Sequence, residues 1–297
     1  PMKRFFLSIF TFLFLFHAIS GQTVFVSTLS EGVNDQSLSL INLQSCDTTN
    51  IMLIPDSIRF SDIAVHPNGN IYATEEATPG AGAANLYLID TLTKTIQTII
   101  NDNSFERSIT FDANGLLYAV NDEVKIYDLA SGQVANKGGL PSGLEVFGAV
   151  GFVNNKLIGI SLATEVFEID IENPENSSIL FQVPSINMDT FPIITGMTTF
   201  AEGCDSAITY ATGYDFFFDP LNPMGFGTIP KIWILDFNEQ NIKLGCKNIL
   251  ANGAASPLEF IASDCELTLD FDLDNSGGLL PYDFPARPPC DSASVLI

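Results

Sequence analysis

Three carboxylates recur at alternate positions near the C-terminal end of the chain. They lie in residues 265–278, CELTLDFDLDNSGG, where leucine and phenylalanine occupy the positions between them. Calcium prefers several oxygen ligands in a flexible arrangement, and closely spaced carboxylates provide such ligands. The residues whose types and spacing could bind a metal ion are therefore Asp270, Asp272 and Asp274.

Two interpretations of this acidic run remain open. The alternate spacing matches the first ligands of an EF-hand loop, but Asn275 stands where that loop needs glycine and Pro281 where it needs a bidentate glutamate. Strict alternation is also typical of an edge strand with one apolar face and one solvated acidic face. Calcium is the one cofactor that the sequence indicates, and only through these three acids.

Residues with nucleophilic or soft-metal chemistry are few and dispersed. His66 is the only histidine after residue 21, and the sequence shows no Ser–His–Asp arrangement around it. We expect its imidazole to be solvated in a turn, and we assign no catalytic residue. No zinc-ligand spacing occurs among the five cysteines, which are Cys46, Cys204, Cys246, Cys265 and Cys290.

The elements that would position any site form a repeat. Five stretches end an alternating apolar strand in the same way, and their last residues follow one another at intervals of 48, 38, 42 and 66 residues. Such intervals are typical of four-stranded propeller blades, with an insertion in the last unit. The stretches are LSLIN (38–42), LYLID (86–90), VKIYD (124–128), VFEID (166–170) and IWILD (232–236).

Alignment on these stretches predicts the remaining strands of each unit. A second strand precedes each stretch and a fourth strand follows it, but the innermost strand is missing from the first unit. Residues 260–264, FIASD, have the character of that strand and follow the last unit. If they pair beside Val24–Ser27, the ring closes without a free sheet edge. The sequence therefore predicts an all-β fold, a β-propeller of five blades closed by a C-terminal strand.

The turns of the repeat have recognisable chemistry. HPNGNIYAT begins at His66 and DANGLLYAV at Asp112, and in both segments Asn-Gly supplies the positive φ of a tight hairpin turn. These segments resemble the blade hairpins of NHL-type and gluconolactonase-like propellers. The Asp or Asn that ends each third strand is expected to cap the next turn with its side-chain oxygen.

The first residues have the layout of a secretory signal peptide. Lys3 and Arg4 precede an apolar run over residues 5–16, and small residues follow. Removal of residues 1–21 would leave 10 basic against 35 acidic residues, a net charge of about −25. Such an acidic surface excludes nucleic-acid binding, which needs cationic groups. We expect a secreted, extracellular or cell-surface protein without a transmembrane span in the mature chain.

Disulfides are expected in an oxidising compartment, although an odd number of cysteines leaves one over. Cys265 and Cys290 bracket the acidic run and its proline-rich return, so they form the first expected pair. Cys46 follows a third strand and Cys246 lies in a fourth strand of what would be adjacent blades. These two cysteines form the second expected pair.

The C-terminal part of the chain carries a second resemblance. A leader and a blade repeat are followed by the Cys-led LDFDLDNSG segment, by Asp283-Phe284, by Cys290 and by a fresh strand at 294–297. This order resembles the N-terminal region of large multidomain surface proteins secreted by gliding bacteria, which continue with cadherin-like or Calx-β-like modules and a gliding-associated sorting domain. The resemblance implies a signal peptide at 1–21, a propeller at 22–265 and a truncated second β module at 266–297, with further domains in the parent chain.

Two functions from different classes compete. The sequence favours a non-catalytic adhesion or binding module with a protein or carbohydrate partner at the cell surface. The aromatic stretch 214–230 is a candidate contact for such a partner if its side chains are exposed, and otherwise it is a loop that covers a blade edge. The resemblance to gluconolactonase-like propellers implies the alternative, a calcium-dependent hydrolase or lactonase. The positions that correspond to its channel ligands lack converging acids and amides, because they are Asp62, Arg107, Gly148, Gly196 and Phe260.

Thermal unfolding tests calcium binding by the acidic run. In a protein that includes the complete second domain, millimolar calcium should raise the unfolding temperature because a cation neutralises adjacent carboxylates, and magnesium should raise it less. Asp272→Asn should weaken the calcium effect and leave the propeller unchanged. An unfolding temperature that ignores calcium, or moves equally in both proteins, would assign the acids to a solvated strand face.

Overall fold

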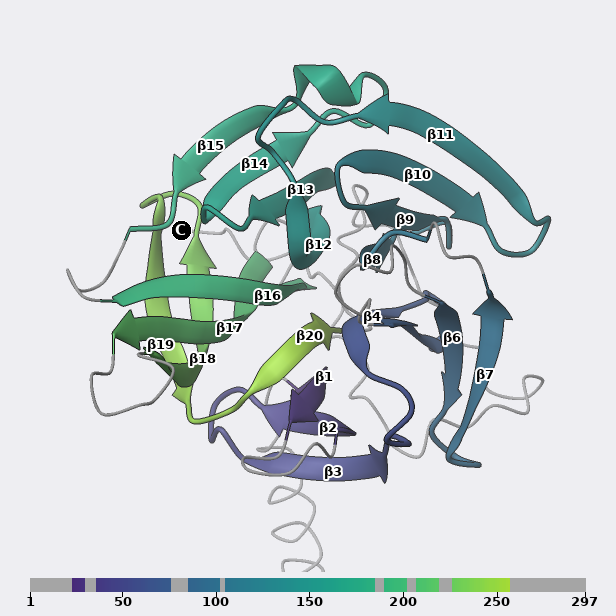
Figure 1. The fold of residues 1–297 in the computed structure, drawn as a ribbon, viewed down its shortest axis with the longest axis horizontal. Coiled ribbons are helices and arrows are strands. Elements are labelled where there is room, and N and C mark those ends of the chain that lie inside the picture. The colour runs from purple at the N-terminus through teal and green to yellow at the C-terminus, as the bar shows by residue number, and fades with distance from the viewer. Residues whose placement is uncertain are drawn as a thin grey trace, which may run out of the picture.

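The computed structural model describes residues 23–29, 36–75, 85–101, 105–184, 190–201, 207–218 and 226–256. These residues form five antiparallel four-stranded sheets arranged in a ring, which is a five-bladed β-propeller (Figure 1). The all-β propeller predicted from the repeat is therefore confirmed.

Each blade runs from an axial strand to an outer strand at the rim. Blade 1 contains β20 (Ala251–Ala255), β1 (Thr23–Leu29), β2 (Gln36–Asn42) and β3 (Thr48–Leu53). Blade 2 contains β4 (Phe60–Val65), β5 (Ile71–Glu75), β6 (Leu86–Asp90) and β7 (Thr95–Ile100). Blade 3 contains β8 (Ser108–Phe111), β9 (Leu117–Val120), β10 (Glu123–Asp128) and β11 (Gln133–Gly139).

The last two blades follow the same order. Blade 4 contains β12 (Val146–Val153), β13 (Lys156–Ser161), β14 (Glu165–Ile169) and β15 (Ser178–Gln182), with the short 3-10 helix η1 (Pro174–Asn176) before β15. Blade 5 contains β16 (Thr190–Ala201), β17 (Ala207–Phe218), β18 (Phe226–Asp236) and β19 (Asn241–Lys247).

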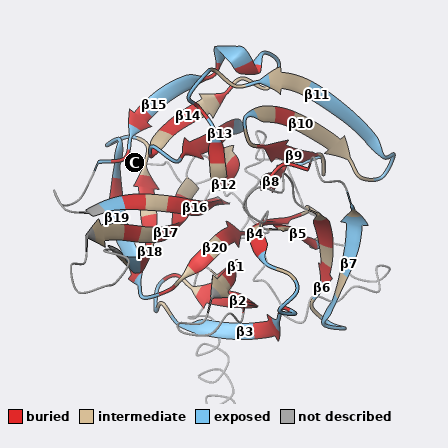
Figure 2. Ribbon diagram, in the orientation of Figure 1, coloured by how far each residue is buried: buried red, intermediate tan, exposed pale blue. Residues whose placement is uncertain are grey.

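Burial falls from the axis to the rim of every blade (Figure 2). All of β8 is buried, whereas β7 and β11 are mostly exposed. Neighbouring blades cover both faces of an axial strand, so its sequence is continuously apolar or small instead of alternating. Five clusters of buried side chains fill the five junctions between blades, and the largest buried side chain, Trp233, lies between blades 4 and 5.

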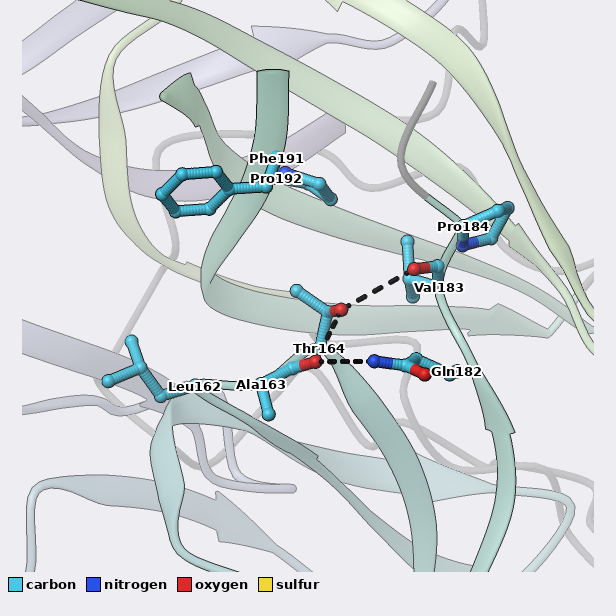
Figure 3. Close-up of a pocket in the computed structure, with 8 residues that line it drawn as sticks. All are labelled: Leu162, Ala163, Thr164, Gln182, Val183, Pro184, Phe191 and Pro192. Carbon is cyan, nitrogen blue, oxygen red and sulfur yellow. Dashed lines mark hydrogen bonds between the residues drawn. The ribbon is translucent and has the colours of Figure 1, made fainter. Parts of the chain in front are cut away.

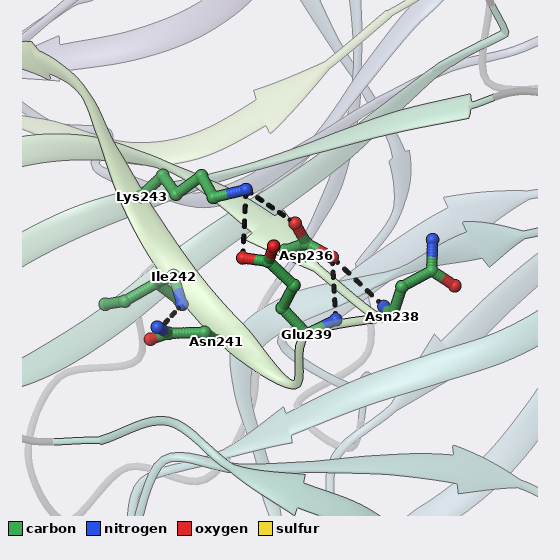
Figure 4. Close-up of polar contacts among 6 residues, drawn as sticks. All are labelled: Asp236, Asn238, Glu239, Asn241, Ile242 and Lys243. Atoms are coloured by element: carbon green, nitrogen blue, oxygen red, sulfur yellow. Dashed lines mark hydrogen bonds and ion pairs between the residues drawn. The ribbon is translucent and has the colours of Figure 1, made fainter.

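Side-chain oxygens cap the turn after every third strand, as predicted. Each accepts backbone N–H groups from the residues two and three positions on, at 2.8–3.1 Å. Figure 4 shows the turn of blade 5, where a hydrogen bond from Lys243 lowers the pKa of the Asp236 carboxyl. The five capping residues hold turns, and they are Asn42, Asp90, Asp128, Asp170 and Asp236.

The ring closes as predicted, but through a different strand. β20 pairs with β1, so a C-terminal strand completes the blade that the N-terminal strand begins. The closing residues are Ala251–Ala255, and the assignment of closure to residues 260–264 was wrong. FIASD is the more apolar segment, yet Ala251 and Ala255 are fully buried and the space beside β4 and β16 admits only small residues.

Backbone meets backbone at the propeller axis. A Cβ atom placed on Gly196 would lie 2.7 Å from the Cα of Gly253, and one placed on Gly253 would lie 2.9 Å from the Cα of Asp62. A Cβ atom on Gly148 would lie 2.5 Å from the carbonyl oxygen of Thr195. Non-bonded atoms do not approach this closely, so glycine at these positions allows the axial strands to touch.

Among the described residues, polar bridges are seen at four of the five blade junctions. In each bridge a side chain of one blade hydrogen-bonds a backbone group on the axial strand of a neighbouring blade, at 2.7–3.0 Å. Apolar side chains around Trp233 fill the junction between blades 4 and 5. The bridges run from Gln36 to Phe60, from Asp62 to Ile109, from Ser108 to Gly148 and from Thr195 to Ala251.

The predicted Cys46–Cys246 disulfide is present and links blade 5 to blade 1. The two residues are 200 positions apart, with their Cα atoms 5.6 Å apart. By the chain-entropy account, a crosslink across such a long loop contributes about 5 kcal/mol to stability. A covalent bond therefore reinforces the junction that β20 closes. Cys204, Cys265 and Cys290 lie outside the described residues, so the Cys265–Cys290 pair stays a prediction.

Residues 1–22 and 257–297 also lie outside the described residues, and with them the predicted signal peptide and second β module. The proposed domain boundaries at 21 and 265 therefore stay predictions. Within the part of the chain that the structure describes, no helix is long and apolar enough to cross a membrane.

Substitution of an axial glycine tests the closeness of the axial strands. Gly253→Ala should lower the free energy of unfolding by about 2 kcal/mol or more, because its methyl group would overlap the backbone of Asp62 and Ile63. Gly139→Ala is the matched control, since the nearest atom to its Cβ would lie 3.6 Å away, and it should change stability by less than about 0.5 kcal/mol. Chemical denaturation measures both, and equal stabilities would contradict a packed axis.

Candidate functional site

Four of the five positions that correspond to the channel ligands of a lactonase lie among the described residues. Asp62 is buried, and its Oδ1 and Oδ2 accept the backbone N–H groups of Ile63 and Ile109, each at 2.9 Å. The Arg107 guanidinium lies over the ring of Phe147, 5.9 Å from its centroid. Gly148 and Gly196 make the close backbone contacts described above, and Phe260 lies outside the described residues. Asp62 is the only carboxylate among the described residues at these five positions, and it joins blade 2 to blade 3.

His66 lies in a hairpin turn as predicted, and its imidazole is half-buried instead of fully solvated. Its ring packs edge-on against Phe111, with ring centroids 5.0 Å apart, and its Nδ1 accepts the backbone N–H of Asn68 at 3.0 Å. Gly115 makes room for the ring, because a Cβ atom there would lie 2.5 Å from the His66 Nε2, and its φ of +82° suits glycine. Burial lowers the pKa of His66, against the opposing effects of Asn68 and the Asp112 carboxylate.

The predicted calcium ligands Asp270, Asp272 and Asp274 lie outside the described residues. Within the described ranges, no group of three or more His, Cys, Asp or Glu residues is placed to hold a metal ion. Calcium therefore stays a proposal that rests on the sequence.

Blade 5 departs from the other blades through its length. β16, β17 and β18 each extend over eleven or twelve residues, and the β17–β18 pairing continues to Phe218 opposite Phe226. Most of the aromatic stretch 214–230 is therefore strand, and the interpretation as a loop was wrong outside residues 219–225, which are not described. The ring of Phe217 lies across Gly227, and Phe216 packs against Phe191 with ring centroids 5.2 Å apart.

A cleft of about 380 Å³ opens between blade 4 and the start of this long sheet (Figure 3). Blade 4 contributes the β13–β14 turn, residues 162–164, and the end of β15 with the residues after it, 182–184. Blade 5 contributes Phe191 and Pro192 at the start of β16. The cleft is thus built from three segments of the chain, two from the sheet of blade 4 and one from the start of blade 5.

The cleft presents apolar surface to solvent. Leu162 is 58% exposed and Phe191 is 51% exposed, although both are large apolar side chains. Val183 lines the same cleft and also belongs to the buried cluster around Trp233 that fills the junction between blades 4 and 5. The cleft therefore adjoins the apolar core of that junction through Val183.

Hydrogen bonds hold the blade 4 side of the cleft in one conformation. The carbonyl oxygen of Ala163 accepts from Thr164 Oγ1 at 2.6 Å and from Gln182 Nε2 at 3.2 Å (Figure 3). The backbone N–H of Val183 donates to the carbonyl oxygen of Thr164 at 2.9 Å. Thr164 is buried and adopts a φ of +65°, an uncommon conformation for threonine that the surrounding contacts must maintain.

A buried ion pair supports the blade 5 side. Asp215 stands opposite Pro192 in the β16–β17 pairing, so the two side chains leave the same face of the sheet. Lys231 Nζ contacts Asp215 Oδ2, and the two side chains are 14% and 2% exposed. Removal of one member of a buried ion pair leaves an uncompensated charge and is strongly destabilising. The pair therefore fixes β17 and β18 behind the cleft.

Sequence reasoning missed the cleft residues. Leu162 follows a second strand in a turn, and Phe191 is the second residue of the axial strand of blade 5, so neither belongs to a motif. The available signal was an apolar residue at a position where the repeat predicts a polar turn. Such single residues are common on protein surfaces and do not by themselves indicate a site.

Comparisons with known proteins add no ligand or activity. No family model matches the chain, and no curated protein is similar to it. Among solved structures, a protein of unknown function from Bacteroides thetaiotaomicron is 14% identical with a TM-score of 0.49, over 82% of this chain and 60% of that chain. A protein of unknown function from Bacteroides caccae is 11% identical with a TM-score of 0.44, over 80% and 98%. TolB from Acinetobacter baumannii is 17% identical with a TM-score of 0.43, over 78% and 53%.

The packed imidazole makes stability depend on pH. Because the folded-state pKa of His66 lies below the value of 6.5 for a free imidazole, the unfolded chain takes up a proton first as the pH falls. Stability should therefore be greatest above pH 6.5 and should decline below it. Thermal unfolding from pH 7.5 to about pH 5.5 measures this slope, and His66→Gln should flatten it. An unchanged slope in the variant would contradict a neutral, packed His66.

Proposed function

We propose that this propeller is a non-catalytic binding module of a secreted multidomain surface protein. The observation that carries the proposal is the cleft between blades 4 and 5, where Leu162 and Phe191 expose more than half of their surface around one hollow. Exposed apolar surface that lines a preformed hollow is typical of binding sites, because its burial by a ligand releases water.

Two further features support an extracellular location. The Cys46–Cys246 disulfide is of the kind that persists in oxidising compartments. The leader-like residues 1–21 and the net charge of −23 fit a soluble protein outside the cell. The order of segments after the propeller supports our proposal that the parent chain is an adhesive surface protein of the type that gliding bacteria secrete, with calcium at Asp270, Asp272 and Asp274.

The competing proposal is a calcium-dependent hydrolase or lactonase. It needs a carboxylate in the channel that is free to bind the metal ion or to act as a base. Asp62 instead receives a backbone N–H on each of its oxygens. The binding proposal is therefore the one that the described side chains support.

Parallel assays of turnover and binding separate the two classes. We expect the chain to release no more product from δ-lactones and aryl esters than the heat-denatured chain does, with or without EDTA. We expect saturable binding to at least one member of an immobilised library of peptides and oligosaccharides, and Leu162→Asp should reduce that binding because a charge enters the apolar cleft. Turnover that EDTA abolishes would favour the hydrolase. Absence of all saturable binding would overturn the binding module.

A further inference from the structure

The chain enters and leaves the propeller at the same edge. β1 begins at Thr23 and β20 ends at Ala255, and their antiparallel pairing places Phe25 opposite Ala255 (Figure 1). The start of β1 and the end of β20 therefore lie side by side at one end of the paired strands. Tension that reaches the ring through its two flanking segments acts on these two neighbouring points.

Tension at these points peels the closing strands apart. In an antiparallel pair the hydrogen bonds run across the strands, so a pull on two adjacent ends lies along the outermost bond and loads the bonds one after another. The ladder between the strands spans only residues 25–28 of β1, and its register shifts between Ser27 and Thr28. The non-covalent closure of the ring therefore gives way in small steps instead of as a whole.

The disulfide lies directly behind the strands that peel. Cys46 lies in the connection between β2 and β3, and Cys246 lies on β19, the last strand before β20. Peeling can release β1 and β2 on one side and β20 on the other, and it then reaches a covalent bond. Beyond that point the load passes through the two sulfur atoms and bypasses the chain between the cysteines, which are 200 positions apart.

The enclosed segment keeps most of the packed ring. β3 and all strands of blades 2 to 5 lie between the two cysteines in the sequence. Three of the five buried clusters of the described residues contain no side chain of blade 1, so they stay complete when its inner strands leave. When tension falls, β1, β2 and β20 can return to a preformed position, which requires far fewer long-range contacts than folding of the whole repeat.

We propose that the Cys46–Cys246 disulfide is a mechanical latch, which restricts the response of the ring under tension to a reversible opening of blade 1. The proposal goes beyond the proposed function, because it assigns to the ring a property that needs no ligand. The use of this latch in a tethered surface protein rests on the proposed function, whereas the latch itself can be measured without it.

Single-molecule force measurements on the full chain, with handles at its two ends, test the latch. In the oxidised protein the step assigned to blade 1 should release residues 23–45 and 247–256, a gain of at most about 120 Å. The Cys46→Ser/Cys246→Ser variant should extend further by about 700 Å, because the 200 residues between the cysteines are no longer shielded. The rest of the chain is identical in both proteins, so the difference in length reports on the enclosed segment.

Repeated cycles of tension and relaxation test reversibility. The oxidised protein should recover its short step in nearly every cycle, since only three strands must dock again. The double variant should recover in fewer cycles, because it must re-form all five blades and long chains that refold under these conditions are prone to kinetic traps.

Two controls separate the latch from a general effect of the cysteines. Cys265→Ser/Cys290→Ser leaves the Cys46–Cys246 bond intact, so the long extension should not occur in this variant. Reduction of the oxidised protein while it is held under tension should produce the long extension without any substitution. This second control keeps the test decisive if the Cys46→Ser/Cys246→Ser variant folds poorly.

The outcomes distinguish the latch from the proposed function. A short, repeatable step in the oxidised protein and a long extension after loss of the disulfide would support the latch. Equal extension with and without the disulfide would overturn it, and so would an oxidised ring that stays closed at the tension that fully extends the double variant. A failed latch leaves the binding module as proposed, and failure of every binding assay leaves the latch unaffected.

Discussion

The propeller depends on contact between the backbones of its axial strands. Five sheets surround one axis, and their inner strands meet so closely that Gly148, Gly196 and Gly253 have no room for a Cβ atom. This closeness brings polar side chains of one blade within hydrogen-bonding distance of backbone groups on the next, as in the bond between Asp62 and the N–H of Ile109. The same constraint accounts for the closing strand, whose sequence ANGAA is small enough for the position that completes the ring.

The junction between blades 5 and 1 has a special task, because it joins the two ends of the repeat. Two features bring the ends together: the pairing of β20 with β1 within blade 1, and the disulfide between Cys46 and Cys246, which links blade 1 to blade 5. The first removes an unpaired sheet edge from the folded ring, and the second restricts the unfolded chain across 200 residues. The closed ring thus provides a scaffold, and a binding surface can lie away from its axial strands.

The junction between blades 4 and 5 borders the cleft. It relies on apolar packing around Trp233, and the long strands of blade 5 carry this apolar surface beyond the buried core. Val183 belongs both to this buried cluster and to the lining of the open cleft, and Leu162 and Phe191 are exposed in the same cleft.

The repeat of alternating strands by itself determined the propeller, its five blades and the turn-capping residues from Asn42 to Asp236, because these features depend on local periodicity and on side chains that bond nearby backbone. Even the Cys46–Cys246 pair followed from equivalent places in the repeat. Tertiary structure alone decided which strand closes the ring, since the space at the axis selects Ala251–Ala255 over a more apolar segment. It also decided that His66 is packed against Phe111 and that Leu162 and Phe191 line one cleft, because these pairs come from different blades and no local pattern encodes the distance between blades.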